Sequence, residues 1–428
     1  MNKLKKIFIY PAIGAVFVAC SDSVDISPVN LTLAIDAPAG IEASSITGGA
    51  FTMSNISTGE VTSFVADASG SAHAAAIPGF YNIAFDGTVI LPNGAEATVS
   101  GSRAGVDISS ATSFRIGTYA TATSADLIIK EIFFTGTLRS SGNGYVGDQY
   151  IKLCSNTSAT VYADGLAIVE SLFNTTRKNV YTPDIMATDF TADAIYLIPG
   201  SGTDYPVEPG GELLVADIAI DHRVANPLSI DLSHADFEWY DQSSTPSTVD
   251  IDNPDVTNLD KWYCYTRSVW QLHNRGFKAY ALARIPLDKE TFLSSNYYTM
   301  DYEQVTVAGT FPMTASAYRI PNDWIVDAVN LSVESSFQWI VTTPALDSGW
   351  AYCGTLDNDK TRYFRAVRRR VAATDGTRIV FADTNNSSVD FNSNVTPSEI
   401  ELQGGAIAAD GTKASAVTLD GVLPAQEL

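Results

Sequence analysis

The segment Leu127–Gly136 reads "LIIKEIFFTG", and it is followed at Gly147–Ser171 by "GDQYIKLCSNTSATVYADGLAIVES". The first segment is typical of a strand with Glu131 at its centre, and the second holds further apolar runs divided by a short polar stretch. β-Branched and aromatic residues favour strands, and outside the N-terminus no helical periodicity persists beyond about three turns. The chain is therefore predicted to be all-β.

The motif spacing in these two segments resembles a lamin-tail domain, which is an immunoglobulin-type β-sandwich. The resemblance rests on Glu131, Asp148, Tyr150, Ile151, Leu153, Asn156 and Leu166. Lys152 stands where that pattern has an acid, and Cys154 stands where an aromatic residue is common. The resemblance implies an immunoglobulin-like sandwich for this part of the chain.

Later segments fit the same template, with long insertions between them. These segments are Tyr205–Ala219, Ile320–Leu331, Arg362–Val371 and Asn392–Glu399. We therefore expect residues 124–400 to form one enlarged lamin-tail-like sandwich, with insertions around 172–194, 236–262 and 288–318. Residues 401–428 are predicted to be a C-terminal hairpin or tail.

Residues 29–120 are predicted to form a separate, small β-sandwich. Val29–Asp36 alternates apolar and polar residues, and turns are expected at Gly59, at Asp67–Gly70 and at Pro78-Gly79. This order of turns resembles seven-stranded sandwiches related to carboxypeptidase regulatory domains. Such modules are spacers and docking surfaces, so no active site is expected here.

The first residues predict export and lipid anchoring. Three lysines in "MNKLKK" precede the apolar run Ile7–Val18, a pattern typical of a secretory signal peptide. The run is too short for a spanning helix, which needs about 20 residues. The following "FVAC" resembles the bacterial lipobox, which implies a signal peptide at 1–19, lipidated Cys20 as the first mature residue, and a tether at 20–28. Plain secretion with unmodified Cys20 is the alternative.

Acidic residues follow Cys20 directly. Asp22 and Asp25 resemble the surface-export signal of Bacteroidetes-type lipoproteins. The resemblance implies a lipid-anchored protein of the outer membrane that faces the cell exterior. An anchor that faces the periplasm is the alternative.

The chain as a whole resembles a Bacteroidetes-type family of uncharacterised surface lipoproteins. The resemblance rests on the lipobox, the small sandwich, and the later motifs "HNRG", "IPNDWIVDAVN" and "DTNNSSVDF". Members of that family are typically encoded beside TonB-dependent transporters, which implies such a transporter as the partner. The expected function is that of a non-enzymatic accessory subunit or substrate-binding partner in nutrient uptake. The alternatives are a structural or adhesive surface lipoprotein that binds a protein or matrix target, and a hydrolase.

Composition and motifs narrow the function further. The formal net charge of −22 and the pI of about 4.4 repel phosphate backbones, so nucleic acid is not expected as a partner. The sequence has no HExxH motif, no GxSxG elbow and no P-loop, so no enzymatic activity is predicted. Cys154, Cys264 and Cys353 lie in apparent strand interiors and are interpreted as buried thiols. One disulfide together with a free thiol is the alternative.

Aromatic residues in or beside the insertions are candidates for a contact surface. Trp and Tyr suit recognition because each combines a large apolar body with a polar tip. The candidates are Trp239, Tyr240, Trp262, Tyr297 and Tyr298. All of these except Trp262 would form a flat platform for a sugar, a peptide or a partner protein if they were exposed together. The alternative places some of them in the core.

The segment Lys360–Arg370, "KTRYFRAVRRR", holds six cations and no acid in a strongly acidic chain. Charges on both faces of a strand predict an edge strand. The candidate contacts for an acidic partner or an anionic ligand are Arg365, Arg368, Arg369 and Arg370. The alternative is that these arginines pair with the protein's own acids.

The densest acidic stretch is Asp250–Asp260. Asp250, Asp252 and Asp255 offer oxygens of the kind that Ca²⁺ prefers, so calcium is the one cofactor considered. The glycine and the terminal glutamate of an EF-hand loop are missing. The alternative is a solvated insertion loop.

Overall fold

The computed structural model describes residues 27–38, 41–90, 96–110, 112–122, 126–157, 159–245, 248–375 and 378–403. The predicted signal peptide, Cys20, most of the tether and the tail beyond Gln403 lie outside these residues. Strands make up most of the regular structure in the described part, which confirms the predicted all-β class. No described helix has the length and apolar character needed to cross a membrane.

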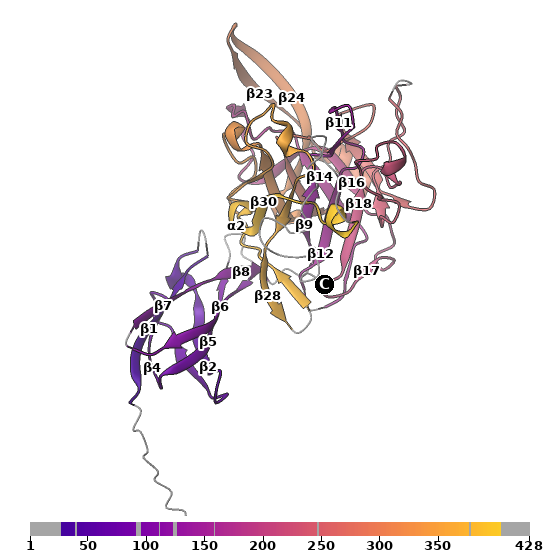
Figure 1. The fold of residues 1–428 in the computed structure, drawn as a ribbon. Helices are drawn as coiled ribbons and strands as arrows, with labels where there is room; N and C mark the ends of the chain where they lie inside the picture. The colour runs from indigo at the N-terminus through magenta and orange to yellow at the C-terminus, as the bar shows by residue number, and fades with distance from the viewer. Residues whose placement is uncertain are drawn as a thin grey trace, which may run out of the picture.

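The N-terminal part of the chain is a small sandwich of two sheets (Figure 1). One sheet has the order β4-β1-β7, built from β1 (Val29–Asp36), β4 (Ser71–Ala76) and β7 (Thr112–Gly117). The other has the order β3-β2-β5-β6-β8, built from β2 (Thr47–Asn55), β3 (Val61–Val65), β5 (Gly79–Ile90), β6 (Glu96–Ile108) and β8 (Tyr119–Ala122). The 3₁₀-helix η1 spans Ala43–Ser45.

Alternating side chains build the core of this small sandwich. In β5, Tyr81, Ile83 and Phe85 are buried while the residues between them are more exposed, because successive side chains of a strand point to opposite faces. The Phe85 ring meets the Phe51 ring of β2 edge-on, at 5.0 Å between centroids. Apolar residues of both sheets meet in this one core.

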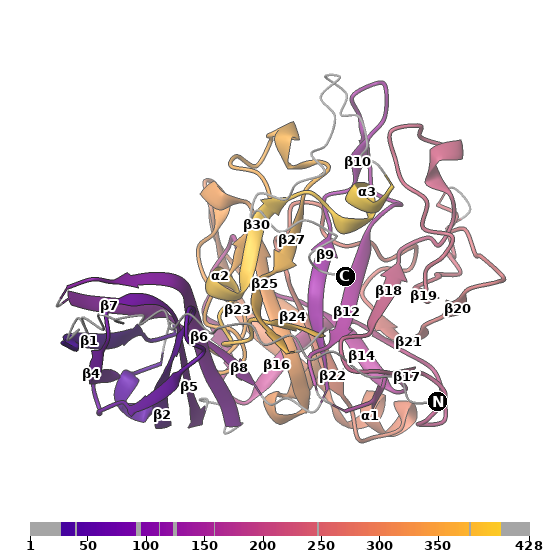
Figure 2. The same ribbon diagram turned by 60° about the horizontal axis from the view of Figure 1, so that its bottom comes forward.

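The rest of the described chain forms a larger sandwich (Figure 2). Its seven-stranded sheet has the order β20-β19-β18-β12-β9-β27-β30, built from β9 (Leu127–Phe133), β12 (Tyr150–Ser155), β18 (Glu212–Ala216), β19 (Phe237–Glu238), β20 (Thr257–Asn258), β27 (Ala366–Arg369) and β30 (Phe391–Val395). Its nine-stranded sheet has the order β15-β23-β24-β16-β14-β22-β25-β26, with β21 also paired to β16. These strands are β14 (Leu166–Ser171), β15 (Tyr181–Thr182), β16 (Asp189–Leu197), β21 (Asp260–Cys264), β22 (Ala279–Arg284), β23 (Tyr297–Thr306), β24 (Gly309–Pro321), β25 (Ile325–Ser332) and β26 (Ala351–Tyr352).

Short elements fill the connections of the larger sandwich. The two-stranded pairs are β10 (Thr137–Leu138) with β11 (Gly144–Tyr145), β13 (Val161–Tyr162) with β17 (Pro206–Val207), and β28 (Val371–Asp375) with β29 (Arg378–Phe381). The α-helices are α1 (Lys289–Ser295), α2 (Ser387–Asp390) and α3 (Ser398–Leu402). The 3₁₀-helices are η2 (His222–Val224), η3 (Asn322–Trp324), η4 (Glu334–Ser336) and η5 (Lys360–Arg362).

The central strands of the larger sandwich are buried on both faces. Every residue of β9, β12 and β14 is buried, because the main core fills the space between the sheets and further apolar clusters cover their outer faces. Such strands need apolar residues on both sides and therefore lose the alternation of a half-exposed strand. This explains why Leu127–Phe133 is nearly continuous in its apolar character.

A buried layer of charge lies under α3. Glu131 of β9 is opposite both Lys152 of β12 and Arg368 of β27 in the strand register. Helix α3 brings Glu399 to 2.7 Å from Lys152 Nζ and Glu401 to 2.9 Å from Arg368 Nη1. All five residues are buried. Ion pairs between the sheet and α3 therefore hold the end of the described chain over the outer face of the seven-stranded sheet.

The prediction of an edge strand at the arginine-rich segment is wrong. Strand β27 lies inside the seven-stranded sheet, between β9 and β30, and its residues Ala366–Arg369 are all buried. Lys360–Arg362 forms η5 instead of continuing the strand. Charged residues occur on both faces here because each face meets buried acids of the same chain, and not because the strand faces solvent.

Candidate functional site

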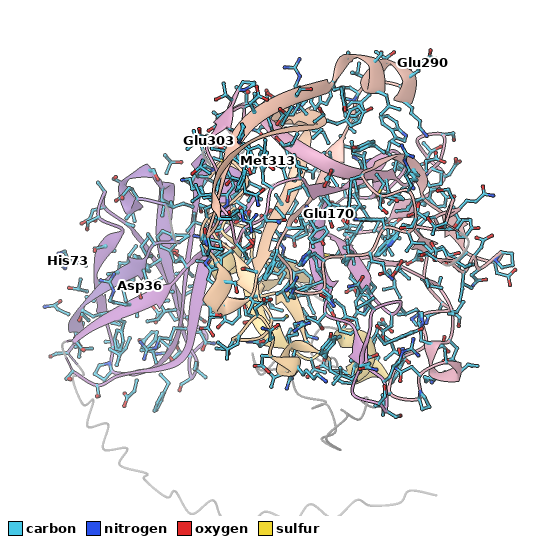
Figure 3. The ribbon with its side chains drawn as sticks, turned by 90° about the horizontal axis from the view of Figure 1, so that it is seen from above. Asp36, His73, Glu170, Glu290, Glu303 and Met313 are labelled. Atoms are coloured by element: carbon cyan, nitrogen blue, oxygen red, sulfur yellow. The ribbon has the colours of Figure 1, made fainter. Side chains whose placement is uncertain are left out.

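The outer part of the β23–β24 hairpin, residues 301–314, projects from the nine-stranded sheet and is called the arm below (Figure 1). Figure 3 shows Glu303 and Met313 on its two strands. A hollow of about 1230 Å³ lies between the arm and the segment 176–182. Arg177 and Lys178 line one wall of the hollow, and Asp301 and Glu303 line the other.

The arm presents apolar side chains to solvent. Val305 is 73% exposed, Val307 111% and Phe311 46%, and Met313 is exposed as well. Residues 304–318 carry no charged side chain. Strand β15 pairs with β23 only at Asp301 and Tyr302, so no described strand pairs with that edge beyond Tyr302. The arm therefore combines apolar atoms with an open strand edge.

Two further hollows lie beside this one. Lys178 also lines a hollow of about 470 Å³ together with Phe337, Trp339 and Trp350. Trp350 and Ser388 then border a third hollow of about 380 Å³, whose other lining residues are Tyr352, Arg370, Phe391, Asn392 and Ser393. The first and second hollows share Lys178, and the second and third share Trp350 and Ser388, so the three are neighbours on the larger sandwich.

Stacked rings form the wall between the second and third hollows. The Phe337 and Trp350 rings are 4.2 Å apart and nearly parallel, at 5°. Tyr352 lies 5.3 Å from Trp350, two residues further along the chain. These residues are not among the predicted contacts, although "FQW" at Phe337–Trp339 and "WAY" at Trp350–Tyr352 each place two aromatic residues on one side of an extended segment.

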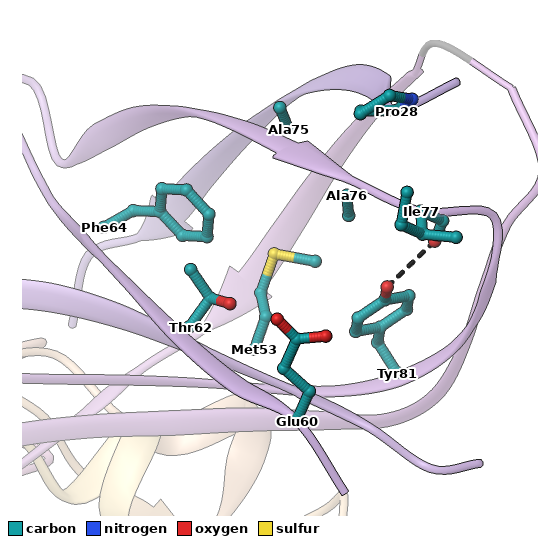
Figure 4. A pocket seen from close by; sticks show the side chains of 9 residues that line it. All are labelled: Pro28, Met53, Glu60, Thr62, Phe64, Ala75, Ala76, Ile77 and Tyr81. Carbon is teal, nitrogen blue, oxygen red and sulfur yellow. Dashed lines mark hydrogen bonds between the residues drawn. The ribbon is translucent and has the colours of Figure 1, made fainter. Parts of the chain in front are cut away.

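A smaller hollow, of about 140 Å³, lies in the N-terminal sandwich (Figure 4). It is lined mainly by core or near-core residues such as Met53, Phe64 and Ala76, and Glu60 lies at its rim. The Tyr81 hydroxyl beside it donates to the carbonyl oxygen of Ile77 at 2.8 Å. The polar side chains that line it are Glu60, Thr62 and Tyr81.

The predicted aromatic platform does not form. Trp239 is fully buried and its ring lies 5.1 Å from that of Trp270, so the expectation that it is exposed is wrong. Tyr297 and Tyr298 are neighbours on β23 and point to opposite faces of the strand. The Tyr298 hydroxyl is 2.6 Å from Thr191 Oγ1. Trp239 was misjudged because burial depends on the second sheet.

The other two aromatic candidates are partly buried. Trp262 lies on β21 with its ring 5.6 Å from Phe292 of α1. Tyr240 follows Trp239 directly and is neither fully buried nor exposed. The structure therefore does not bring the five predicted aromatic residues together on one surface.

The four candidate arginines have separate environments. Arg368 is buried against Glu401, and Arg369 Nη2 is 2.6 Å from Asp327 Oδ2, so the prediction that these two contact an external ligand is wrong. Arg365 is half-buried, with Nη1 3.5 Å from Thr396 Oγ1. Arg370 lines the third hollow. The alternative of pairing with internal acids therefore holds for Arg368 and Arg369.

The three aspartates considered for calcium do not form a cation site. Asp250 Oδ2 accepts from the Asp241 backbone N–H at 2.7 Å, and Asp252 Oδ1 accepts from Asn258 Nδ2 at 2.9 Å. Asp255 is exposed. Across the described ranges, no group of three or more His, Cys, Asp or Glu side chains is arranged to hold a metal ion.

Cys154, Cys264 and Cys353 are free thiols. Cys154 and Cys353 are buried, whereas Cys264 is only partly buried. Burial raises the pKa of Cys154 to about 12 and that of Cys264 to about 11, and it also raises the pKa of Cys353. The thiolate is the reactive form, so these side chains act as small apolar residues.

A buried carboxyl group beside Trp239 gives a prediction for pH dependence. Burial, and then the charge of Asp250, raises the pKa of Asp217 well above its usual range. The folded state therefore holds a proton on Asp217 that the unfolded state releases. The contribution of this proton to the free energy of unfolding is complete below about pH 4, the usual pKa of an unfolded aspartate. It is lost as the pH rises from there through the pKa of the folded state. Asp217→Asn is expected to be more stable than wild type at neutral pH, by on the order of 1 kcal/mol.

Chemical denaturation of both proteins between pH 4 and pH 8 measures this difference. The gain of Asp217→Asn over wild type should grow as pH rises, because the amide does not ionise. Asp323→Asn, the same substitution at an exposed aspartate, is measured beside it as the control. A constant gain across this pH range would contradict the raised pKa of Asp217.

One family model matches part of the chain. The profile of DUF4876, a family of proteins of unknown function, matches residues 208–398. A crystal structure of a DUF4876 family protein from Bacteroides thetaiotaomicron resembles this fold with a TM-score of 0.52 and 20% identity, covering 86% of this chain and 96% of that chain. A DUF3823 family protein from Parabacteroides merdae has 11% identity over 34% of this chain and 67% of that chain, and its TM-score of 0.15 is too low to indicate a shared fold. No curated protein matches the chain. The chain therefore carries a DUF4876 family domain at residues 208–398.

Proposed function

We propose that this protein is a lipoprotein of the outer cell surface that serves as a non-enzymatic accessory subunit or substrate-binding partner of a TonB-dependent transporter. The observation that carries the binding role is the arm, with its exposed apolar residues and open strand edge. The lipobox-like "FVAC" and the aspartates after Cys20 support the location. The transporter partner follows from the family resemblance of the whole chain.

The arm has the physical properties of a docking element. Burying a large apolar side chain contributes about 1.5–3 kcal/mol, and Val305, Val307 and Phe311 leave this energy unused in the isolated chain. The open edge of β23 offers backbone groups to which a partner can add a strand. Long exposed edges that are not blocked by charge promote association. The charge-free tip therefore favours a protein partner.

The position of the arm also suits a membrane-anchored partner. In Figure 1 the arm projects from the top of the larger sandwich, whereas the N-terminal sandwich lies at the lower left. The predicted anchor precedes Val29 at the start of β1. A lipid at Cys20 would thus leave the arm free to reach a neighbouring protein, with the small sandwich as a spacer.

A pull-down of the full-length, lipidated protein from detergent-solubilised outer membranes tests this function. The wild type is expected to co-purify with a TonB-dependent transporter. A variant with Val305, Val307, Phe311 and Met313 all changed to Ser should recover roughly tenfold less transporter, because its apolar contacts are lost. The matched control changes Val61, Val65 and Phe80, which are exposed on the N-terminal sandwich, to Ser.

The outcomes separate the candidate functions. Absence of any transporter from the wild-type sample contradicts the accessory role. Capture of a matrix or host protein in its place favours the adhesive alternative. Equal recovery with the arm variant and with wild type would show that the partner binds elsewhere on the chain.

A further inference from the structure

The third hollow combines aromatic rings with an unpaired cation. Trp350, Tyr352 and Arg370 all line it. Arg370 Nε donates to the Phe391 carbonyl oxygen at 3.3 Å, and the guanidinium makes no ion pair with any described residue. This distinguishes Arg370 from the preceding Arg369, whose charge is neutralised by buried acids. Most of the hydrogen-bonding capacity of Arg370 is thus available to a ligand.

The rings of this hollow are held rigidly before any ligand arrives. The Trp350 backbone N–H donates to Ser388 Oγ at 3.0 Å, and Ser388 Oγ in turn donates to the Trp350 carbonyl oxygen at 3.0 Å. The adjoining loops meet at Asp347, which is fully buried and accepts from Ser387 Oγ at 2.7 Å and from Asn330 Nδ2 at 2.8 Å. A fixed site loses little conformational entropy on binding.

The position before Trp350 requires a glycine, Gly349. A Cβ at Gly349 would collide with Asn386 Oδ1 and with the backbone nitrogen of Ser388. The Gly349 N–H also donates to Asp347 Oδ1 at 3.0 Å. The close approach of these two segments keeps Trp350 at the border of the second and third hollows.

We propose that this hollow binds a pyranose sugar that carries a carboxylate. The Tyr352 ring and the face of the Trp350 ring that is not stacked on Phe337 are electron-rich and attract the C–H groups on one side of a sugar ring. Arg370 can donate two parallel hydrogen bonds to a carboxylate. Ser393 also lines the hollow and offers a hydroxyl group to the ring hydroxyls. This site is separate from the arm and extends the proposed function by naming a ligand class.

The two other ligand classes fit the hollow less well. A neutral sugar would stack on the rings but leave Arg370 without a partner. An acidic peptide would pair with Arg370 but lacks the rigid C–H face that suits the rings. Of these three classes, an acidic sugar alone both stacks on the rings and pairs with Arg370, so the two contacts should contribute together to affinity.

Isothermal titration calorimetry with the full-length protein in detergent tests the site. The probes are trigalacturonic acid, the neutral cellotriose and the peptide triglutamate. Trigalacturonic acid is expected to bind at least tenfold more tightly than either of the others. Arg370→Gln should weaken its binding by about tenfold or more, because a charged hydrogen bond is lost. Trp350→Ala should weaken it similarly, and Trp350→Phe should retain part of the affinity.

Matched controls and contrary outcomes are available. Arg319→Gln and Tyr297→Ala change an exposed arginine and an exposed tyrosine outside the hollow, and both should bind like wild type. Equal binding of triglutamate would show that charge alone is recognised and would overturn the sugar assignment. Absence of trigalacturonate binding, or full binding by Arg370→Gln, would overturn the site. Neither result depends on the arm or on recovery of a transporter.

Discussion

Replacing Arg369 with alanine is expected to lower the free energy of unfolding by about 3–5 kcal/mol, as when one partner of a buried ion pair is removed. The Arg369 side chain is buried, with Nη2 2.6 Å from Asp327 Oδ2 and Nη1 3.3 Å from Asp383 Oδ1. Its Nε also donates to the Ile129 carbonyl oxygen at 2.8 Å. Without the cation, these carboxylates stay buried with no opposite charge beside them. Chemical denaturation followed by tryptophan fluorescence measures the loss.

Fluorescence reports on the correct part of the molecule, because all six tryptophans lie between Trp239 and Trp350 in the larger sandwich. Arg370→Ala is the matched control, since Arg370 is adjacent in sequence but pairs with no described acid. Its stability should stay within about 0.5 kcal/mol of wild type. Arg369→Lys retains the charge but not the planar fork, and should fall between the two. An Arg369→Ala variant as stable as Arg370→Ala would contradict the buried network.

The strand content of the chain was predictable because the signal is local. The apolar run Leu127–Phe133 and the alternating β5 segment each carry their preference in their own side chains. The residues that pack over a strand, in contrast, come from distant parts of the sequence. Lys152 and Arg368 look solvent-exposed in sequence, and they are buried because α3 places two glutamates over them. Residues so distant in the chain carry no sequence signal for each other.

The candidate surface was harder to predict for the same reason. Trp239 and Trp350 have similar polar and aromatic neighbours in sequence, yet Trp239 lies in the core and Trp350 borders two hollows. The difference comes from the second sheet, which closes over Trp239 but ends beside Trp350. The sequence predicts the arm only as part of an insertion. Its exposure could not be predicted, because it depends on how far β23 and β24 extend beyond the neighbouring strands.

Replacing Trp239 with alanine is expected to cost about 3–5 kcal/mol of folding stability, as for other large aromatic residues removed from a core. Its side chain is fully buried and its ring lies 5.1 Å from Trp270, which stacks on Tyr196 at 4.7 Å. Truncation leaves a cavity in the main core between the two sheets, and the surrounding rings can relax only in part.

The same substitution at Trp350 separates a core role from a binding role. Trp350 is only partly buried and borders open hollows, so Trp350→Ala should cost much less stability than Trp239→Ala in the same chemical denaturation. Trp239→Phe keeps a ring in the core and should recover part of the loss, which shows that lost packing is the cause. If Trp239→Ala changed stability by less than about 1 kcal/mol, Trp239 would not be a core residue, and the platform of surface aromatic residues would have to be reconsidered. Trp350→Ala should lose sugar affinity and keep most of its stability, whereas Trp239→Ala should lose stability. The two variants therefore distinguish a residue that builds the core of the sandwich from one that faces a ligand.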